Sequence, residues 1–346
     1  MAQSKVVSRR NLPANWLTVL RTCNAPPGRV DAVSRWLVLT RACVQPMTLT
    51  AAAIAGLLAA RVPGFDPWLF ALASVGILLA HAANNLMNDL FDLESGNDTA
   101  DYPRALYAPH PVLSGWITRG GLVRATAVVN VVDLGILVAL TVARGWPIVG
   151  FALGGFVISA GYAAPPLRLK QHGLGEPGVF VVWGPLMVGG TYFAATGKLP
   201  WHVVAATIPY ALLTTSVLMG KHIDKLPWDA GRHVGTLPAI LGEERARRLN
   251  LALMAGFYVA LAALVGTGVL PLPALVAFGG LPLLAKVWKA YREPRPAEPP
   301  PDYPVWPLWY TAAAFIHTRR AGALFVLGLA VAAALPHSVG SAWTLP

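Results

Sequence analysis

The chain has 346 residues, of which 55% are hydrophobic and only 12% are charged. A typical soluble domain has about 25% charged residues, so this composition excludes a soluble globular protein and indicates a polytopic membrane protein. The formal net charge is +11, with 27 Lys and Arg against 16 Asp and Glu. In a membrane protein such an excess is first a signal of topology, because basic residues collect on the cytosolic side.

Residues 1–35 are basic and contain no apolar core, so we expect a cytosolic leader and not a cleavable signal peptide. The two cysteines, Cys23 and Cys43, have no CxxC spacing and support neither a disulfide framework nor a zinc site. Nine apolar stretches are long enough, or nearly so, to cross about 30 Å of hydrocarbon. The predicted spans are 43–60, 68–88, 122–143, 147–164, 178–196, 202–220, 249–267, 271–287 and 321–336.

Short loops with few polar residues alternate with longer, polar loops between these spans. With the N-terminus in the cytosol, the outer links contain only Arg61, Arg144 and Lys198 of the 27 basic residues. We therefore expect an integral, multi-pass protein of a bacterial cytoplasmic membrane, in contact with membrane lipid, with a cytosolic N-terminus and an external C-terminus. Because topology accounts for the basic residues, we expect no nucleic-acid partner, and the sequence identifies no protein partner.

Four regions are expected from this pattern. Residues 1–35 form the basic leader, and 36–290 form the bundle that contains spans one to eight. Residues 291–320 form a Pro-rich cytosolic loop followed by a short interfacial helix from Trp306 to Ile316, where aromatic side chains suit the headgroup level. Arg319 and Arg320 mark the cytosolic entry of the ninth span, and 321–346 contain that span and a short outer tail.

Oxygen-rich side chains gather over residues 84–99, where the second span leaves the bilayer. On a helix, four of the polar residues share one face through spacings of 4, 3 and 4: His81, Asn85, Asn88 and Asp92. Such a face would cost several kcal/mol against lipid, so we expect it to line the bundle interior or a wet cavity. Gly96 allows the chain to turn back and aim Asp98 at the same point. Asp89 lies about 100° round the helix and is expected to orient ligands or contact solvent.

A second acidic cluster follows the sixth span, over residues 221–229. It places Asp224 and Asp229 just past the expected cytosolic end of that span. The two clusters follow the second and sixth spans, so they are four spans apart. This spacing suggests a weakly duplicated four-helix unit. Two acidic clusters that face one cavity are suited to Mg²⁺ ions holding a diphosphate and stabilising it as a leaving group. The alternative is two unrelated, solvated loops.

Several basic residues near these clusters are candidates for binding the same anion. They are Arg104, Arg168, Lys170, Lys221, Lys225 and Arg232. Each is also a candidate topology determinant. Lys170 and Lys221 are the strongest candidates because they lie closest to the helix ends at the expected cavity.

The pattern Asn88-Asp89-Leu90-Phe91-Asp92, followed by Gly96-x-Asp98-Thr99, resembles the first signature of the UbiA superfamily of intramembrane prenyltransferases. The Gly96-x-Asp98 form is similar to the 1,4-dihydroxy-2-naphthoate prenyltransferase branch, which makes menaquinone precursors. The resemblance continues over residues 162–176, 190–193 and 224–242, which together with the first motif cover spans two to six and the next loop.

This resemblance implies an all-α, UbiA-like bundle of about nine transmembrane helices, with an active-site cavity that opens to the cytosolic side and Mg²⁺ as the cofactor. Asn88, Asp92 and Asp98 would hold Mg²⁺ on one side of an isoprenoid diphosphate, and Asp224 and Asp229 on the other. Lys170 would contact the diphosphate. The isoprenoid tail would lie among the helices in a cavity open to lipid. Ionisation of the allylic C–O bond would give a carbocation that a π-nucleophile attacks.

The catalytic candidates are therefore Asp92, Asp224 and Lys170. The substrate-binding candidates are Asn84, Asn85, Arg104, Tyr162, Arg168, Lys170, Lys221, Lys225 and Arg232. Two features depart from the family pattern. Asp224 and Asp229 are five residues apart instead of four, with Pro227 between them, and Gly220-Lys221-His222-Ile223 stand where the quinone branch has asparagine and arginine.

The leading hypothesis is an Mg²⁺-dependent transferase that moves an isoprenoid from its diphosphate to a lipophilic, aromatic quinone precursor. A second enzymatic hypothesis is a UbiA-type membrane terpene cyclase, in which the carbocation is quenched internally. A non-enzymatic hypothesis is an ion-coupled transporter, because acidic motifs in repeated units also coordinate ions.

Overall fold

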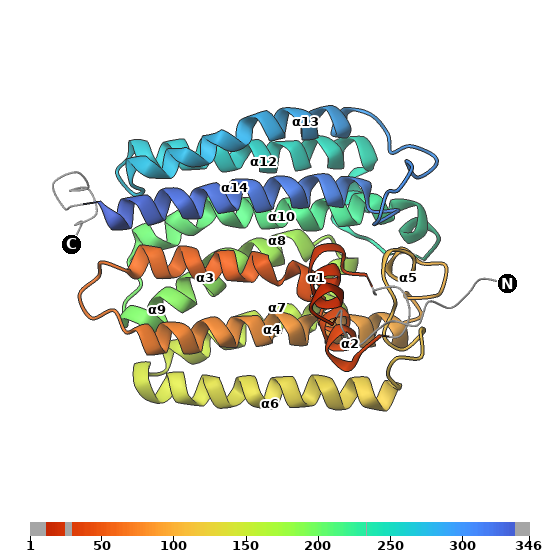
Figure 1. Cartoon of the computed structure of the whole chain (residues 1–346), viewed down its shortest axis with the longest axis horizontal. Helices are drawn as coiled ribbons and strands as arrows, with labels where there is room; N and C mark the ends of the chain where they lie inside the picture. The colour runs from red at the N-terminus through yellow and green to blue at the C-terminus, as the bar shows by residue number, and fades with distance from the viewer. Residues whose placement is uncertain (1–11, 25–29, 233, 336–346) are drawn as a thin grey trace.

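The computed structural model describes residues 12–24, 30–232 and 234–335, and it is an all-helical bundle. The long helices run side by side along one direction, and the short helices α1 (Leu12–Thr22), α2 (Ala32–Leu39) and α5 (Pro103–Tyr107) lie together at one end (Figure 1). The first part of the basic leader and the expected outer tail lie outside the described residues.

Eight segments of the described chain are long and apolar enough to cross a membrane. Six of them are built on the helices α3 (Gln45–Ala59), α4 (Pro67–Glu94), α6 (Arg119–Arg144), α10 (Trp201–Asp229), α12 (Glu243–Gly266) and α14 (Trp309–Ala334). The other two are composite: α8 (Gly175–Val181) with the π-helical η4 (Val182–Gly189) and α9 (Gly190–Thr196), and the 3₁₀ segment η6 (Leu272–Gly280) with α13 (Leu281–Arg292). Helix α7 (Pro147–Ala163) is apolar but shorter.

Local sequence signals explain where several helices begin and end. The Asp66 side chain accepts hydrogen bonds from the N–H groups of Trp68 and Leu69, and Pro67 opens α4. At the same end of the bundle (Figure 1), Arg61 donates to the carbonyl of Ala333 in the last turn of α14. Its guanidinium therefore satisfies a carbonyl that has no partner within the helix.

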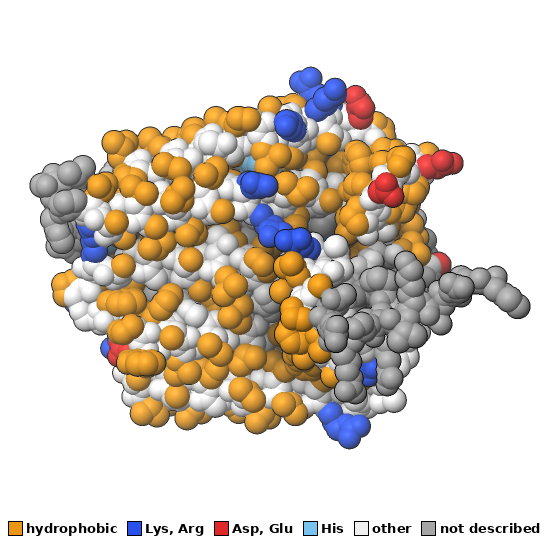
Figure 2. Space-filling view, in the orientation of Figure 1, with side chains coloured by type: hydrophobic (Ala, Val, Ile, Leu, Met, Phe, Trp, Pro, Cys, Tyr) orange, Lys and Arg blue, Asp and Glu red, His pale blue; other side chains and the backbone are white. Residues whose placement is uncertain are grey.

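Charged side chains are distributed unevenly over the surface. The flank of the bundle is mainly hydrophobic, whereas most of the charged side chains visible on this face lie in the half that contains α1, α2 and α5 (Figure 2). This is the end at which α4 and α10 both finish (Figure 1). The polar segments of the second and sixth predicted spans are therefore brought to the same end of the molecule.

Two expected helix ends are wrong. The sixth span was expected to stop near residue 220, but α10 continues to Asp229. Pro227 removes only one intrahelical hydrogen bond, and the last turns of α10 are largely buried, so packing maintains the helix. The interfacial helix and the ninth span were expected as separate elements, but α14 runs unbroken from Trp309 to Ala334. Arg319 and Arg320 do not interrupt it because both are exposed and arginine is a good helix former.

The N-terminal region also differs from expectation. Residues of the leader fold into α1 and α2, and the Asp31 carboxylate caps α2 by accepting from Ser34 N. Cys23 and Cys43 are joined by a disulfide. The sequence supported no such bond, because only the packing of α1 against η2 (Ala42–Val44) brings the two cysteines together.

Close packing fixes the position of α10, the helix that contains the second acidic cluster. Helix α10 packs against α12, α14, α8 and η4. The largest buried apolar cluster includes Tyr210, Met254, Phe257 and Phe325 from α10, α12 and α14. At Gly220 a Cβ atom would lie 2.9 Å from the carbonyl oxygen of Tyr310. The absence of a side chain there allows α10 and α14 to approach closely.

Candidate active site

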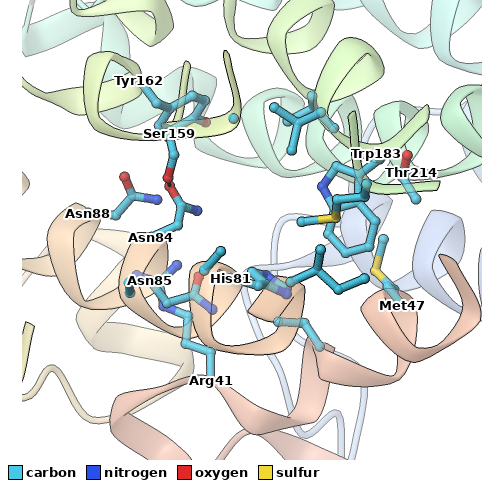
Figure 3. Close-up of a pocket in the computed structure, with 18 of the residues that line it drawn as sticks. Arg41, Met47, His81, Asn84, Asn85, Asn88, Ser159, Tyr162, Trp183 and Thr214 are labelled. Carbon is cyan, nitrogen blue, oxygen red and sulfur yellow. Dashed lines mark hydrogen bonds between the residues drawn. The ribbon is translucent and has the colours of Figure 1, made fainter. Parts of the chain in front are cut away.

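A cavity of about 900 Å³ lies inside the bundle, between α3, α4, α6, α7, η4, α9, α10 and α14. Figure 3 shows Met47 and Trp183 on one side of it, and Asn84, Asn85 and Asn88 on another. Most of its lining is apolar. The lining side chains Leu134, Leu153 and Phe156 are each more than half exposed, so the cavity reaches the outer surface between α6 and α7.

A second, much smaller cavity of about 10 Å³ adjoins the first, and we call it the polar chamber. Its lining residues are Arg41, Asn88, Asp92, Asp98, Arg104, Tyr107, Tyr162, Lys170, Lys221, His222 and Lys225. Six of these also line the large cavity: Arg41, Asn88, Arg104, Tyr107, Tyr162 and Lys221. The two cavities are thus neighbours that share a wall of polar side chains. Predicted site residues that line neither cavity are Arg168, Asp224, Asp229 and Arg232.

The end of α4 builds the oxygen-rich side of the polar chamber. The N–H groups of Asn97 and Asp98 donate to the Asp92 carbonyl at 2.9 and 3.0 Å, and Gly96 adopts a φ of +72° that glycine tolerates without strain. This turn returns Asp98 toward Asp92. The Asp92 carboxylate is paired with the ammonium of Lys170 from η3 (Leu169–Gln171), although the two residues are 78 positions apart in the sequence.

Two oxygens of this side have no hydrogen-bond partner within the described chain, although both are buried: Oδ1 of Asn88 and Oδ1 of Asp98. Buried oxygens rarely remain unpaired, so each is suited to accept a ligand that the protein itself does not supply. A carboxylate and an amide oxygen are the donors that a hard divalent cation prefers.

Asp89, in the second-last turn of α4, is fully buried. It accepts two hydrogen bonds from Arg104, from Nε at 2.9 Å and from Nη2 at 2.8 Å, and it also pairs with Arg41. Burial alone would lower the pKa of Arg104, but the Asp89 carboxylate raises it above its usual value, so the guanidinium stays charged. Asp89 therefore orients two arginines of the polar chamber.

Two side chains around Asp89 and Asp98 were not predicted from the sequence. Arg41 follows α2, ahead of the first span, and had no motif to mark it. His110, in the loop after α5, places its Nε2 3.5 Å from Oδ2 of Asp98. With Asp89 it completes a buried group of three residues whose candidate ligand atoms lie within 4.8 Å of one another. No spacing signal in the sequence would have found either residue.

The second acidic cluster lies differently from the first. The Asp229 carboxylate accepts a hydrogen bond of 2.6 Å from the hydroxyl of Tyr102. The Asp224 carboxylate accepts from Tyr310 N at 3.0 Å, from Thr311 N at 2.8 Å and from the Thr311 hydroxyl at 2.6 Å. Asp224 therefore satisfies N–H groups in the first turn of α14.

The remaining predicted substrate-binding residues divide into two groups. Asn84 accepts from the Ser159 hydroxyl at 2.8 Å, as Figure 3 shows, and Asn85 donates to the Thr40 carbonyl at 3.0 Å. Both line the large cavity. Arg232 instead donates to the Thr99 hydroxyl at 2.9 Å and lies outside both cavities.

A buried chain of three side chains ends at the wall between the cavities. The hydroxyl of Tyr162 lies 2.9 Å from Nε2 of His222, and Nδ1 of His222 lies 2.7 Å from Glu176. Figure 3 shows Tyr162 opposite Asn88 across the cavity. Glu176 is the member that sequence reasoning did not single out, and the contact with His222 fixes the position of the tyrosine.

The helices are long enough to cross a membrane, and the apolar cavity between them ends in a chamber of amide, carboxylate and ammonium groups, which is typical of a membrane protein whose ligand has an apolar part and a charged part. A sequence profile of the UbiA prenyltransferase family matches residues 49–306, most of the chain. The chain belongs to this family of prenyl-transferring enzymes, and it is a multi-pass integral membrane protein.

Individual relatives are distant. UbiA prenyltransferase domain-containing protein 1 of Dictyostelium discoideum is 24% identical over 221 residues, 61% of this chain and 61% of that protein. The 1,4-dihydroxy-2-naphthoate octaprenyltransferase of Escherichia coli (strain K12) is 29% identical over 240 residues, 68% of this chain and 77% of that protein.

Solved structures share the fold. A UbiA homolog from Aeropyrum pernix K1 in its apo form matches with a TM-score of 0.62 and 19% identity, over 83% of this chain and 97% of that one. A UbiA homolog from Archaeoglobus fulgidus bound to GPP and Mg²⁺ matches with a TM-score of 0.58 and 15% identity, over 84% and 99%. At these identities the likeness establishes a common architecture.

Proposed function

We propose that the chain is an Mg²⁺-dependent intramembrane prenyltransferase that moves an isoprenoid from its allylic diphosphate to a lipophilic, aromatic quinone precursor and releases diphosphate. The observation that carries this proposal is the junction of the apolar cavity of about 900 Å³ with the polar chamber. An isoprenoid tail is apolar and a diphosphate is anionic, so the apolar cavity suits the tail and the polar wall that the two cavities share suits the head group. The E. coli relative, named for a dihydroxynaphthoate acceptor, supports the quinone-precursor assignment.

The metal assignment rests on the α4 side of the chamber. Asn88, Asp92 and Asp98 would hold Mg²⁺, and the unpartnered oxygens of Asn88 and Asp98 fit that role. The Archaeoglobus homolog bound to GPP and Mg²⁺ supports it. When bound, the ion would offset negative charge that develops on the leaving diphosphate. The proposal does not depend on Asp224 or Asp229, whose carboxylates have protein partners.

The chain's own side chains have separate tasks in this scheme. Lys170, held by Asp92, would contact the diphosphate and orient it. The apolar wall excludes water from the allylic carbon, and the indole of Trp183 offers a π face to developing positive charge. The opening between α6 and α7 would admit a lipophilic acceptor from the bilayer, because the side chains there are exposed to lipid.

Topology follows from the same proposal. Helix α7 would serve as the ninth membrane segment despite its length, since it lines the cavity between α6 and η4. The polar chamber would face the cytosol of a bacterial cell, with the N-terminus on that side and the C-terminus outside. The basic leader and the bundle of the first eight predicted spans keep their proposed boundaries, the Pro-rich segment ends where α14 begins at Trp309, and α14 supplies the last span.

The test is a transfer assay on the purified protein in detergent. A panel of allylic diphosphates of different chain lengths is incubated with and without 1,4-dihydroxy-2-naphthoate, and products are read by mass spectrometry together with released diphosphate. We expect prenylated acceptor and diphosphate, both lost in EDTA, and a loss of about 10²-fold or more in kcat for Asp92→Asn.

Wild-type turnover by a folded Asp92→Asn variant would show that the metal assignment is wrong. A cyclic hydrocarbon formed without any acceptor would identify a terpene cyclase instead. Metal-dependent diphosphate cleavage in detergent, where no gradient exists, excludes transport as the sole activity.

A further inference from the structure

The continuation of α10 to Asp229 determines which of its side chains face the polar chamber. Lys221, Lys225 and Asp229 are four residues apart, so they lie on one face of the helix. Gly220 and Asp224 form the adjacent face, since Asp224 lies about 100° from Lys225. Both lysines line the polar chamber, whereas Asp224 lines neither cavity. The face of α10 that meets the substrate is therefore cationic.

The Asp224 carboxylate is bound mainly by α14. Its three hydrogen bonds, all from Tyr310 and Thr311, use most of the acceptor sites of a carboxylate, and the residue is completely buried. The close approach at Gly220, one turn earlier, holds the same face of α10 against the same part of α14. Asp224 is thus a helix-capping group between two packed helices.

Asp229 acts on the chamber through an intervening tyrosine. Its carboxylate accepts from the Tyr102 hydroxyl at 2.6 Å, and the Tyr102 ring lies 4.3 Å from the ammonium nitrogen of Lys225. Burial and the nearby Asp229 carboxylate raise the pKa of Tyr102, so its hydroxyl remains a donor to that carboxylate. Asp229 is therefore a positioning residue: it fixes the ring against which Lys225 stacks.

Lys221 and Lys225 have no hydrogen-bonded or ion-paired carboxylate within the described residues. Lys225 is nevertheless only 5% exposed. Five cationic side chains line the chamber, namely Arg41, Arg104, Lys170, Lys221 and Lys225. Three carboxylates oppose them: Asp92 and Asp98 line the chamber, and Asp89 pairs with Arg41 and Arg104 from behind it. Unpaired charges in a buried site are costly unless a ligand compensates them, so this excess is suited to a multiply charged anion.

We propose that the α10 side of the site binds the substrate diphosphate directly through the ammonium groups of Lys221 and Lys225, and that it holds no metal ion. The inference rests on the proposed function and deepens it. It replaces the second metal-binding cluster implied by the family resemblance with a pair of lysines, and confines Mg²⁺ to the α4 side. Lys221 and Lys225 become determinants of diphosphate affinity, with Asp229 and Tyr102 in support.

The first experiment measures the affinity of the full-length protein in detergent for inorganic pyrophosphate by isothermal titration calorimetry, once in EDTA and once in Mg²⁺. We expect the wild type to bind pyrophosphate in EDTA. Lys221→Met and Lys225→Met should each weaken this binding about 10- to 100-fold, the effect of losing one charged hydrogen bond to the ligand. Lys225→Arg should retain most of the affinity because it keeps the charge.

Lys289→Met on the exposed side of α13 is the matched control, and it should bind pyrophosphate as the wild type does. Thermal melting of each variant verifies that it is folded. Unchanged pyrophosphate affinity in folded Lys221→Met and Lys225→Met would overturn the inference. If those variants also transfer a prenyl group normally, the proposed function stands without it. A wild type that neither binds pyrophosphate in either buffer nor releases it from any allylic diphosphate would overturn both.

The second experiment counts metal ions without reference to turnover. Electron paramagnetic resonance with Mn²⁺ in place of Mg²⁺, in the presence of pyrophosphate, should show bound Mn²⁺ without the spin coupling of a closely spaced pair. Asp224→Asn should leave the bound Mn²⁺ unchanged. A coupled pair of ions that disappears in Asp224→Asn would show that α10 does bind metal, and would refute the proposal.

Discussion

The capping role of Asp224 leads to a quantitative prediction about stability. Asp224→Ala removes the acceptor for two N–H groups and one hydroxyl, at distances of 2.6 to 3.0 Å, in a place where water does not reach. Each buried donor left unpaired costs about 1–3 kcal/mol, and partial relaxation makes the three costs less than additive. We therefore expect a loss of about 3–5 kcal/mol in the free energy of unfolding.

Thermal unfolding in detergent, followed by circular dichroism at 222 nm, measures this loss. A chain of this size changes its Tm by about 2 °C per kcal/mol, so Asp224→Ala should melt about 6–10 °C below the wild type. Asp101→Ala is the control, because Asp101 is an exposed carboxylate whose ion pair with Arg232 is open to solvent. It should leave the Tm unchanged.

The comparison is repeated in EDTA, because a capping group and a metal ligand respond differently to chelation. A cap stabilises the fold with or without metal, so the difference in Tm between Asp224→Ala and the wild type should be the same in both buffers. A variant that melts with the wild type, or a difference that appears only when Mg²⁺ and pyrophosphate are present, would refute the reasoning.

Three further predictions concern other parts of the chain. Asp89→Asn leaves two buried guanidinium groups without their anion and should destabilise the fold by about 3–5 kcal/mol, measured as a lower Tm or loss of folded protein. Gly96→Ala should cost about 1 kcal/mol from backbone strain alone, since no atom lies within 4 Å of the added Cβ, and Gly96→Asn should melt closer to the wild type. Burial would raise the pKa of Asp31, but hydrogen bonds from Ser34 and Trp16 outweigh it and lower the pKa to about 2. Its stabilising effect is therefore complete above pH 3.8 and lost as the pH falls toward 2, so the difference in Tm between wild type and Asp31→Asn should shrink across that window, and a constant difference would contradict the assignment.

Hydrophobicity was sufficient to predict the membrane bundle, because an apolar run of membrane length has few alternative structures. The ends of the helices were harder to predict. The sixth span was expected to end before the second acidic cluster, yet burial of the turns around Pro227 keeps α10 helical to Asp229. Arg319 and Arg320 indicated a boundary, yet both are exposed residues within an unbroken α14. In each case tertiary packing, which no local pattern reports, outweighs the local signal.

The candidate site was predictable where it is built from one segment. The helical spacing of Asn88 and Asp92 and the turn at Gly96 are local features, and they place these residues and Asp98 in one chamber. Contacts across the fold were not predictable. The partners of Asp224 lie on a helix 86 residues later, and Arg41 reaches the chamber from a segment without any motif.

The close packing at Gly220 has a consequence for how the ligand preference of the pocket can change in evolution. A Cβ atom at Gly220 would also lie 3.0 Å from Thr311 N. The close contact between α10 and α14 therefore requires glycine at this position, and that contact fixes the rotation of α10 about its own axis. A rotation of about 100° would exchange Lys225 for Asp224 at the chamber wall. The sign of the charge offered to a ligand is thus decided on the adjacent face of the helix, by a residue that lines neither cavity. Mutations at that distant contact would change ligand preference while every pocket-lining residue stays the same.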